Sequence, residues 1–276
     1  MSTGEPDAAP RDVAPAVDAA TVMLVRPSRP GVETLLLERH VRSEFGGALV
    51  FPGGVVDEQD RGLSTERWYG RDPATWRELL GVPDAAHALG LLVAAVRETF
   101  EEAGVLLATR RGRPVTDTDL AESGFVEVRR RLASRDEHFD WRDWLADEDL
   151  VLDLGALAPW SWWVTPKDAP KRFDTRFFVA RAPRDQDPLH DDHETIESLW
   201  VRPAEALARF HAGDLGMFPP TVRNLEFLAP HANTDEVLAA AASVGTPPTI
   251  LPKLRVDAEG KVEGIAMPDD PDYEAL

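Results

Sequence analysis

The segment from Ala85 to Ala103 constrains this chain most, because it predicts one long helix that ends in a cluster of acids. The segment is rich in alanine and contains no proline, and Gly104 follows it, a residue suited to the left-handed conformation that stops a helix. Glu98, Glu101 and Glu102 fall within about 100° of arc on such a helix, so their carboxylates crowd one face and repel one another. A hard divalent cation would relieve that repulsion, and carboxylate oxygens suit Mg²⁺ or Mn²⁺.

The overall charge supplies a plainer alternative for this helix face. The chain has 49 Asp and Glu against 30 Lys and Arg, a formal net charge of −19, and a solvated acidic face is common in such chains. The same charge argues against nucleic acid as a partner, because that binding depends on Lys and Arg at the phosphates. It would also repel an anionic substrate unless basic groups or bound cations reverse the sign locally.

Several classes of protein are excluded by composition. The absence of cysteine rules out disulfides, thiolate zinc sites and cysteine nucleophiles. No apolar run approaches the roughly 20 residues that span a bilayer, and the N-terminus lacks the basic and apolar regions of a signal peptide. We therefore expect a cytoplasmic protein with no membrane partner. The oligomeric state stays open, a homodimer included.

Turn signals and apolar runs predict one α/β domain. Residues 1–18 lack periodicity and are expected to form a flexible tail, and residues 19–276 form the domain, with insertions at about 61–89 and 110–150. The basic run Arg129-Arg130-Arg131 is expected on an exposed helix face. Strands are predicted at 20–25, 34–39, 48–51, 160–165, 173–180 and 196–201, helices at 85–103, within 117–147, from Pro203, after Pro219 and at 234–243, and a hairpin near 257–260.

A glycine turn upstream strengthens the interpretation of the acidic helix as a metal site. The run Val50-Phe51-Pro52-Gly53-Gly54 predicts a short strand that ends in a turn. Glycine permits unusual dihedral angles and a close approach, so a carbonyl at Gly53 could complete a metal shell.

Together these residues resemble the Nudix box, whose pattern is Gly, five residues, Glu, seven residues, then Arg-Glu-apolar-x-Glu-Glu-x-Gly-apolar. Gly54 matches the first glycine, and the block from Arg97 to Val105 matches the second half. The resemblance implies a Nudix-type α/β/α sandwich around a mixed sheet, with helical insertions, and a hydrolase that cleaves a diphosphate linkage. It also implies that Glu98, Glu101 and Glu102 hold magnesium and help to generate the attacking hydroxide. From the helical spacing alone, Arg97 lies one turn before Glu101 and can pair with it, which fixes its direction.

The box departs from the pattern at three points. Asp60 stands where the first Glu belongs and is one methylene shorter, so we expect it to reach the metal through water. Asp60 and Arg97 are separated by 36 residues where the pattern has seven, and Thr99 replaces an apolar residue. An interrupted box is similar to that of the Nudix branch that includes the peroxisomal coenzyme A diphosphatase, and the resemblance extends over most of residues 20–230.

Basic residues between 167 and 184 are the first candidates for substrate binding. This segment contains six basic residues but only two acidic ones. Strand alternation places Arg172, Asp174 and Arg176 on one face. The planar guanidinium suits bidentate phosphate contacts, so we predict that Arg172 or Arg176 binds the substrate. A structural ion pair with Asp174 is the alternative. Arg39, at the end of a predicted strand, is a further candidate.

Acidic and aromatic groups elsewhere have weaker assignments. Glu194 precedes the strand at 196–201, where many Nudix enzymes supply a further carboxylate, and could bind a second metal or act as general base. A solvated acidic loop is the alternative. The three tryptophans of the run 160–163 are expected in the core rather than stacked on adenine, and Phe45 could stack instead.

Coenzyme A or an acyl derivative is the leading substrate, cut to 4′-phosphopantetheine and adenosine 3′,5′-bisphosphate. The same chemistry on ADP-ribose or a dinucleotide is one alternative. A Nudix-like module that binds a nucleotide without cutting it is the other.

Overall fold

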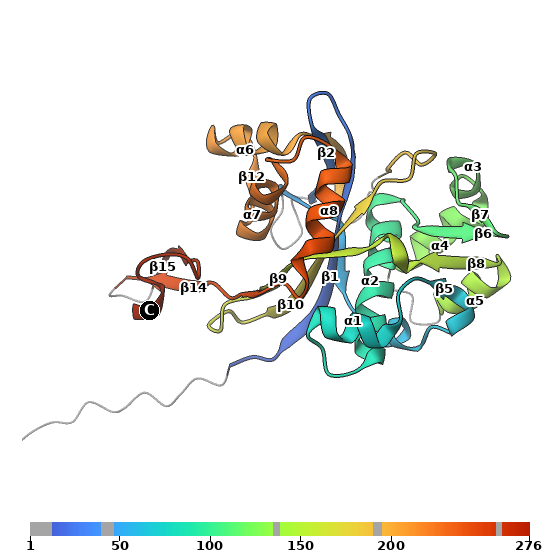
Figure 1. Ribbon diagram of the computed structural model, residues 1–276, viewed down its shortest axis with the longest axis horizontal. Coiled ribbons are helices and arrows are strands. Elements are labelled where there is room, and N and C mark those ends of the chain that lie inside the picture. The colour runs from blue at the N-terminus through green and yellow to red at the C-terminus, as the bar shows by residue number, and fades with distance from the viewer. Residues whose placement is uncertain (1–12, 40–46, 135–138, 190–194, 258–260) are drawn as a thin grey trace, which may run out of the picture.

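The computed structural model describes residues 13–39, 47–134, 139–189, 195–257 and 261–276. A mixed sheet forms the centre of this described part, with helices on both faces (Figure 1). Its nine strands are β1 (Ala16–Pro27), β2 (Val32–Arg39), β3 (Ala48–Val50), β4 (Gly53–Val55), β9 (Ala158–Val164), β10 (Arg172–Arg181), β11 (Thr195–Val201), β12 (Gly216–Met217) and β13 (Thr249–Ile250).

The long strand β1 organises the sheet, whose order is β12-β3-β2-β1-β10-β9-β13, with β11 on β2 and β4 on β1. Strand β10 runs parallel to β1, whereas β2 and β4 run antiparallel to it and share its other edge. Ala20 pairs with Arg176 on one side and with Gly54 on the other. These three residues therefore form a row across three neighbouring strands.

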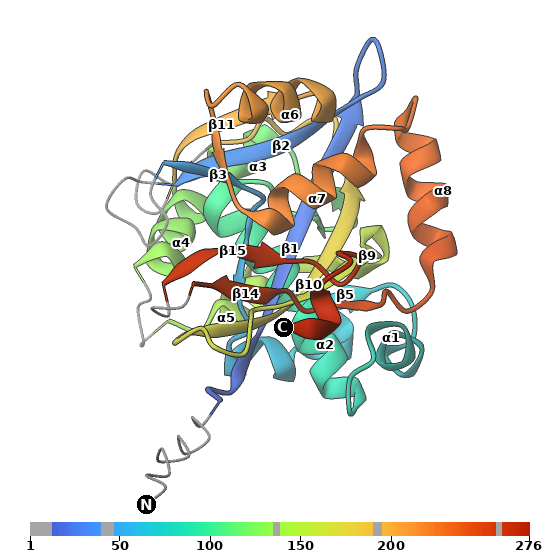
Figure 2. The same ribbon diagram turned by 90° about the vertical axis from the view of Figure 1, so that its left-hand side faces the viewer.

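Alternation along β1 divides its side chains between two cores. Ala20, Val22 and Leu24 pack with helix α2 (Ala85–Ala103). Met23 and Val25 belong to the second core, on the face covered by α6 (Pro203–His211), α7 (Pro219–Leu228) and α8 (Thr234–Val244). Figure 2 views the molecule from the side of these three helices. Each aliphatic side chain buried this way contributes about 1.5–3 kcal/mol.

Helix α2 has the predicted bounds and the predicted glycine stop, and the structure adds a cap at its N-terminal end. The Asp84 side chain caps the first turn by accepting from the backbone N–H of His87 at 2.8 Å. Gly104 ends the helix in the left-handed conformation, with φ 69° and ψ 12°. Gly90 inside the helix has a packing reason, since a Cβ there would lie 2.9 Å from Cγ of Arg61.

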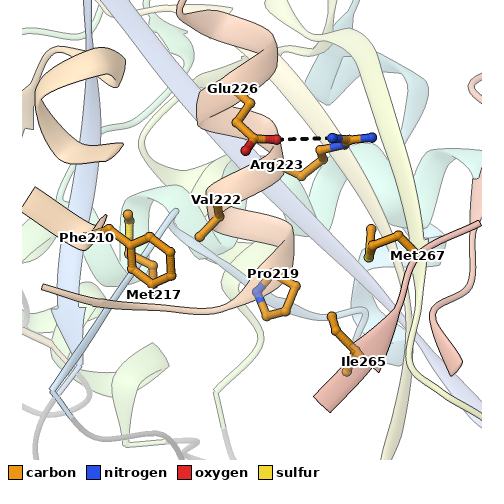
Figure 3. A pocket seen from close by; sticks show the side chains of 8 residues that line it. All are labelled: Phe210, Met217, Pro219, Val222, Arg223, Glu226, Ile265 and Met267. Carbon is orange, nitrogen blue, oxygen red and sulfur yellow. Dashed lines mark hydrogen bonds and ion pairs between the residues drawn. The ribbon is translucent and has the colours of Figure 1, made fainter. Parts of the chain in front are cut away.

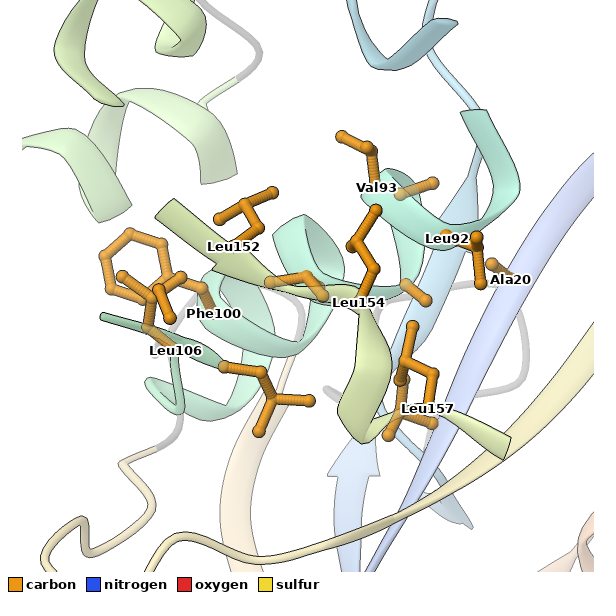
Figure 4. Packing of buried hydrophobic residues seen from close by; sticks show 14 of the residues in the cluster. Ala20, Leu92, Val93, Phe100, Leu106, Leu152, Leu154 and Leu157 are labelled. Atoms are coloured by element: carbon orange, nitrogen blue, oxygen red, sulfur yellow. The ribbon is translucent and has the colours of Figure 1, made fainter. Parts of the chain in front are cut away.

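The segments predicted as insertions contribute strands to a second sheet, whose order is β5-β8-β6-β7. Trp68 pairs with Leu152, and Figure 4 shows Leu152, Leu154 and Phe100 of α2 in the same hydrophobic cluster. The described residues of the predicted helical region 117–147 form helices α3, α4 and α5. The elements are η1 (Glu58–Gly62), η2 (Thr65–Arg67), β5 (Trp68–Tyr69), α1 (Pro73–Leu80), β6 (Ala108–Arg110), β7 (Arg113–Pro114), α3 (Asp117–Leu120), α4 (Ser123–Ala133), α5 (Trp141–Asp147), β8 (Leu150–Asp153) and η3 (Leu154–Ala156).

Two expectations about local structure are wrong. The tail was expected to reach residue 18, but β1 begins at Ala16, because Ala16 already pairs with Arg172 of β10. Gly53 and Gly54 were expected in a turn, but they lie in β4 against β1, after a bend at Pro52 whose carbonyl accepts from the N–H of Val22 at 2.9 Å.

The C-terminal region contains the predicted hairpin, formed by β14 (Lys253–Val256) and β15 (Val262–Ala266), followed by η4 (Tyr273–Ala275). In the ranges given above, no single helix is long and apolar enough to cross a membrane. Helices α1 and α2 pass such a test only as a pair, and they meet at 84°.

Candidate active site

Arg97 lies at the centre of the acidic cluster, buried near the C-terminal end of α2. Its Nη2 donates to the carbonyl of Val55 at 2.9 Å, and its Nε and Nη2 both donate to Asp60. Its guanidinium lies within ion-pair distance of four carboxylates, those of Asp57, Asp60, Glu98 and Glu101. Burial opposes the charge of Arg97, but Glu98 and Asp60 outweigh it and hold the pKa of Arg97 above its ordinary value.

Asp60 lies directly against Arg97. Its side chain is fully buried, and both of its carboxylate oxygens accept from Arg97, at 3.0 Å to Nε and 2.9 Å to Nη2. Its Oδ2 also accepts from the N–H of Asp57 at 2.8 Å. The shorter side chain is therefore engaged with the arginine of the box, which favours a supporting role.

Glu98 lies directly against β4. A Cβ on Gly54 would come within 2.6 Å of the Glu98 carboxylate, so only glycine leaves room for that group. Glu98 Oε1 accepts from Nη1 of Arg97 at 2.9 Å. Burial raises the pKa of the Glu98 carboxyl, although Arg97 opposes this.

Glu101 and Glu102 complete the acidic turn. Glu101 Oε2 accepts from Nη1 of Arg97 at 3.3 Å, which confirms the predicted pairing between these two residues. Glu102 Oε2 accepts from the backbone N–H of Gly53 at 2.9 Å. Two neighbouring glycines of β4 thus contact two glutamates of α2, and the interruption of the box does not separate its two halves in space.

The donor set fits a hard divalent cation in its chemistry. One guanidinium faces four carboxylates, and Glu102 stands beside them, so the cluster carries an excess of negative charge that a cation would balance. Over the stretches of chain the structure covers, no three acidic or histidine side chains converge closely enough to hold a metal as they stand. Glu98 and Glu101 point to Arg97, and Glu102 points to Gly53.

The two arginines predicted to bind substrate are engaged by the protein itself. Arg172 donates to the carbonyls of Thr165 at 3.2 Å, Pro166 at 3.1 Å and Ala14 at 2.7 Å. Its guanidinium therefore ties the start of β1 to the loop after β9. The structural alternative is favoured for Arg172, although its main partners are carbonyls rather than Asp174.

Arg176 is buried on the same side of the sheet. It pairs with Asp174, lies 3.6 Å from the ring centroid of Trp162, and its Nε donates to the carbonyl of Leu80 at 2.9 Å. Leu80 is the last residue of α1, so Arg176 holds the first insertion onto the sheet. The ion pair with Asp174, stated above as the alternative, is present.

Three other predicted groups have different outcomes. Arg39 ends β2 opposite Thr195 of β11, and Thr195 Oγ1 lies 3.4 Å from the carbonyl of Glu102, so Arg39 lies near the end of α2. Glu194 and Phe45 lie outside the described residues.

The aromatic run belongs to the core, as predicted, at two of its three positions. Trp160 and Trp163 are buried in the core beneath α7 and α8. Trp162 instead packs under Arg176 and donates from Nε1 to Asp174 Oδ1 at 2.6 Å.

Arg129 contradicts the expectation of an exposed basic run. Its side chain donates to main-chain carbonyls at the end of α2, including that of Glu102 at 2.9 Å. No sequence signal marks this contact, since its acceptors are backbone atoms.

An apolar groove of about 290 Å³ lies between α7, β12 and β15 (Figure 3). Met217 of β12 pairs with Leu49 of β3, and β3 leads through Pro52 into Gly53 at the acidic cluster. The lining residues are Phe210, Met217, Pro219, Val222, Arg223, Glu226, Ile265 and Met267. Arg223 is paired with Glu226 at one wall.

Comparisons with known proteins agree with this arrangement. The family profile of the NUDT19 Nudix domain matches residues 81–228. The chain is 28% identical over 284 residues to the acyl-coenzyme A diphosphatase NUDT19 of Gallus gallus, covering 87% of this chain and 74% of that protein. It is 32% identical over 247 residues to the Homo sapiens protein of the same name, covering 76% of this chain and 65% of that protein.

A solved structure supports the fold independently. The crystal structure of a Nudix hydrolase from Alicyclobacillus acidocaldarius superposes with a TM-score of 0.69 at 28% identity. The match covers 85% of this chain and 99% of that one. The predicted α/β Nudix architecture is confirmed.

Proposed function

Because the chain belongs to the NUDT19 Nudix domain family, a family of diphosphohydrolases, we propose that it cleaves the diphosphate linkage of coenzyme A or an acyl-coenzyme A. Two curated relatives carry the name acyl-coenzyme A diphosphatase, which supports this substrate class. We further propose Mg²⁺ or Mn²⁺ as the cofactor, with Glu98, Glu101 and Glu102 as its ligands. A cytoplasmic location and a single domain with two insertions stay predictions, and the oligomeric state stays open, a homodimer included.

One observation carries the proposal: the two halves of the interrupted box meet. The N–H of Gly53 contacts Glu102, and the missing side chain of Gly54 makes room for the Glu98 carboxylate. A solvated acidic face would need neither contact. The buried state of Glu98 and Glu102 further supports a site rather than a surface.

The chemistry divides between the cation and the chain. Glu98, Glu101 and Glu102 would hold the divalent cation, which would supply charge neutralisation for the diphosphate and make water a better nucleophile. Arg97 orients Glu98 and Glu101 through its Nη1 and is itself held by Asp60. A carboxylate, Glu98 or Glu194 in our proposal, accepts the proton of the water that attacks phosphorus. The phosphorus–oxygen bond of the bridge then breaks, and the bridging oxygen leaves with one phosphate.

We propose three assignments on the basis of these contacts. Asp60 supports Arg97 and is not a direct ligand, because Arg97 engages both of its oxygens. The Gly53 carbonyl stays a proposed ligand, because the hydrogen bond from the Gly53 N–H to Glu102 keeps Gly53 next to another proposed ligand. Arg39 takes the phosphate-binding role first considered for Arg172 and Arg176. It pairs with Thr195 of β11, and Thr195 Oγ1 lies 3.4 Å from the carbonyl of Glu102 at the end of α2.

The apolar groove offers a place for the pantetheine or acyl arm of the substrate. The chain from Leu49, beside Met217, to Gly53 contains three intervening residues and spans at most roughly 13 Å. Two methionines, whose side chains adapt to varied apolar shapes, line the groove. ADP-ribose and dinucleotides lack such an arm, which favours coenzyme A over these alternatives.

The proposal is tested by incubating the protein with Mg²⁺ or Mn²⁺ and a panel of coenzyme A, a long-chain acyl-coenzyme A, ADP-ribose and a dinucleotide. Products are identified by mass, and 4′-phosphopantetheine or its acyl form together with adenosine 3′,5′-bisphosphate is expected. Glu102→Gln should lower kcat on the order of a hundredfold or more, because it removes a charged ligand. Glu127→Gln, on the exposed face of α4, is the matched control.

Each outcome has a separate meaning. Turnover of ADP-ribose or a dinucleotide alone would transfer the same chemistry to another substrate. Nucleotide binding without turnover, unchanged in Glu102→Gln, would identify a binding module. Full activity of Glu102→Gln would refute the proposed metal site.

A further inference from the structure

Arg129 of helix α4 reaches out of the second insertion to the last turn of α2. Its Nε donates to the carbonyls of Phe100 at 3.1 Å and Glu101 at 2.8 Å, and its Nη2 donates to that of Glu102 at 2.9 Å. Its Nη2 also donates to the carbonyl of Leu189. One side chain thus contacts three consecutive carbonyls of the helix that carries the acidic cluster.

The end of α2 has a particular need for such donors. The last four carbonyls of a helix lack partners inside it, and they give that end a partial negative charge. In α2 this charge adds to the carboxylates of Glu101 and Glu102 in the same turn. The positive guanidinium of Arg129 therefore satisfies carbonyls and offsets charge where both effects are strongest.

Further contacts at this helix end come from a third part of the chain. The N–H of Leu189 donates to the carbonyl of Ala103 at 2.9 Å, and Thr195 Oγ1 lies 3.4 Å from the carbonyl of Glu102. Leu189 and Thr195 are the described residues on either side of the segment 190–194. Arg129 donates to both α2 and Leu189, so it links helix α4, the end of helix α2 and the main chain at Leu189.

Close packing around Gly104 restricts this junction. A Cβ on Gly104 would lie 3.1 Å from Nη1 of Arg129 and 3.2 Å from the carbonyl of Leu189, tighter than ordinary contact. The guanidinium is therefore held between a helix end and a neighbouring main chain, so it has little freedom to take another position.

We propose that Arg129 is a positioning residue for the metal site, which fixes Glu101 and Glu102 through the main-chain carbonyls of the turn that carries them. This rests on the proposed function, because it assigns a role in metal binding to these two glutamates. It also gives the second insertion a purpose: α4 supplies the group that holds the acidic turn in place. Loss of Arg129 weakens metal binding and lowers kcat, whereas KM for the substrate changes little.

The test compares Arg129→Met, which keeps the length of the side chain, with Arg129→Lys, which keeps the charge but loses the fork of donors. Arg130→Met is the matched control, because Arg130 is the next residue and pairs on the surface with Glu127. Mn²⁺ affinity is measured directly by electron paramagnetic resonance without substrate, kcat and KM are measured at limiting and at saturating Mn²⁺, and circular dichroism monitors folding.

The expected result is a rise of about tenfold in the Mn²⁺ Kd of Arg129→Met, with a smaller rise for Arg129→Lys and none for Arg130→Met. At limiting metal kcat should fall, and saturating metal should restore part of it. A folded Arg129→Met that binds Mn²⁺ as wild type does would overturn the proposal, even if its melting temperature is lower. If Arg129→Met does not fold, Thr195→Val is measured instead, because it removes the second donor to the Glu102 carbonyl. This variant should also raise the Mn²⁺ Kd, and an unchanged Kd would count against the proposal.

Metal binding separates this inference from the proposed function. If wild type binds Mn²⁺ but cleaves no diphosphate compound, the proposed substrate fails, and the comparison of Kd values still tests Arg129. If wild type binds no Mn²⁺, the metal site itself fails, and the role of Arg129 fails with it.

Discussion

Gly54 lies against the carboxylate of Glu98, so closely that a Cβ on Gly54 would come within 2.6 Å of Cδ and Oε1 and 2.7 Å of Oε2. The two residues belong to the two halves of an interrupted box, one on strand β4 and the other on helix α2. The strand can approach the helix this closely only because it has no side chain at this position.

This contact predicts the effect of the smallest substitution. Gly54→Ala should force the Glu98 carboxylate to move and should raise the Kd for Mn²⁺ by about tenfold or more, with a matching fall in kcat/KM. Gly264→Ala is the control, because a Cβ there meets nothing within 4 Å. Equal Mn²⁺ affinity in Gly54→Ala and wild type would show that Glu98 is not needed at the metal.

The buried pair between Asp60 and Arg97 should be sensitive to loss of either charge. Asp60→Asn leaves a buried guanidinium without its bidentate partner, so the free energy of unfolding should fall by about 3–5 kcal/mol in urea titrations. Asp235→Asn, which breaks the exposed pair with Arg181, should cost no more than about 1 kcal/mol. A loss below 1 kcal/mol in Asp60→Asn would contradict the supporting role of Asp60.

Acid should destabilise the second insertion through Asp119. Hydrogen bonds from Arg113, and further ones from the Thr116 backbone and Arg110, outweigh burial and hold the pKa of Asp119 well below its ordinary value. A carboxyl with a lowered folded-state pKa adds stability that is present above the unfolded-state pKa and is lost as the pH falls toward the folded-state pKa.

The free energy of unfolding of wild type should therefore decrease on acidification below about pH 4. It is measured in urea at a series of pH values. Asp119→Asn should start from a lower stability at pH 7 and show a flatter decrease, whereas the exposed Glu263→Gln should follow wild type. Parallel pH profiles for Asp119→Asn and wild type would disprove the contribution of this group.

The contacts of Arg172 and Arg176 predict effects on stability rather than on substrate choice. Arg176→Ala should lower the free energy of unfolding by about 1.5–3 kcal/mol, because it removes charged hydrogen bonds to Asp174 and the Leu80 carbonyl. In Arg172→Ala and in Arg176→Ala, the ratio of kcat/KM for coenzyme A to that for the dephosphorylated compound should stay unchanged. A selective loss on coenzyme A in either variant would return that arginine to substrate binding, and Arg39→Ala is measured beside them.

The sequence by itself determined the features whose causes are local. Helix α2 has its predicted bounds, because its composition, the Asp84 cap and Gly104 all lie within or beside the segment. The common face of Glu98, Glu101 and Glu102 follows from helical periodicity alone. Most strands, the helix start at Pro203 and the resemblance to the Nudix box were likewise available from residue types and spacing.

Only the tertiary structure decided which groups these residues meet. Arg129, Arg172 and Arg176 each donate to main-chain carbonyls from distant parts of the chain. A carbonyl is the same in every residue, so no residue type in the sequence marks it as the partner of an arginine. The glycines of β4 illustrate the same limit. Their identity predicted a turn, but the approach of β1 on one side and Glu98 on the other placed them in a strand, because only packing determines what must fit against a missing side chain.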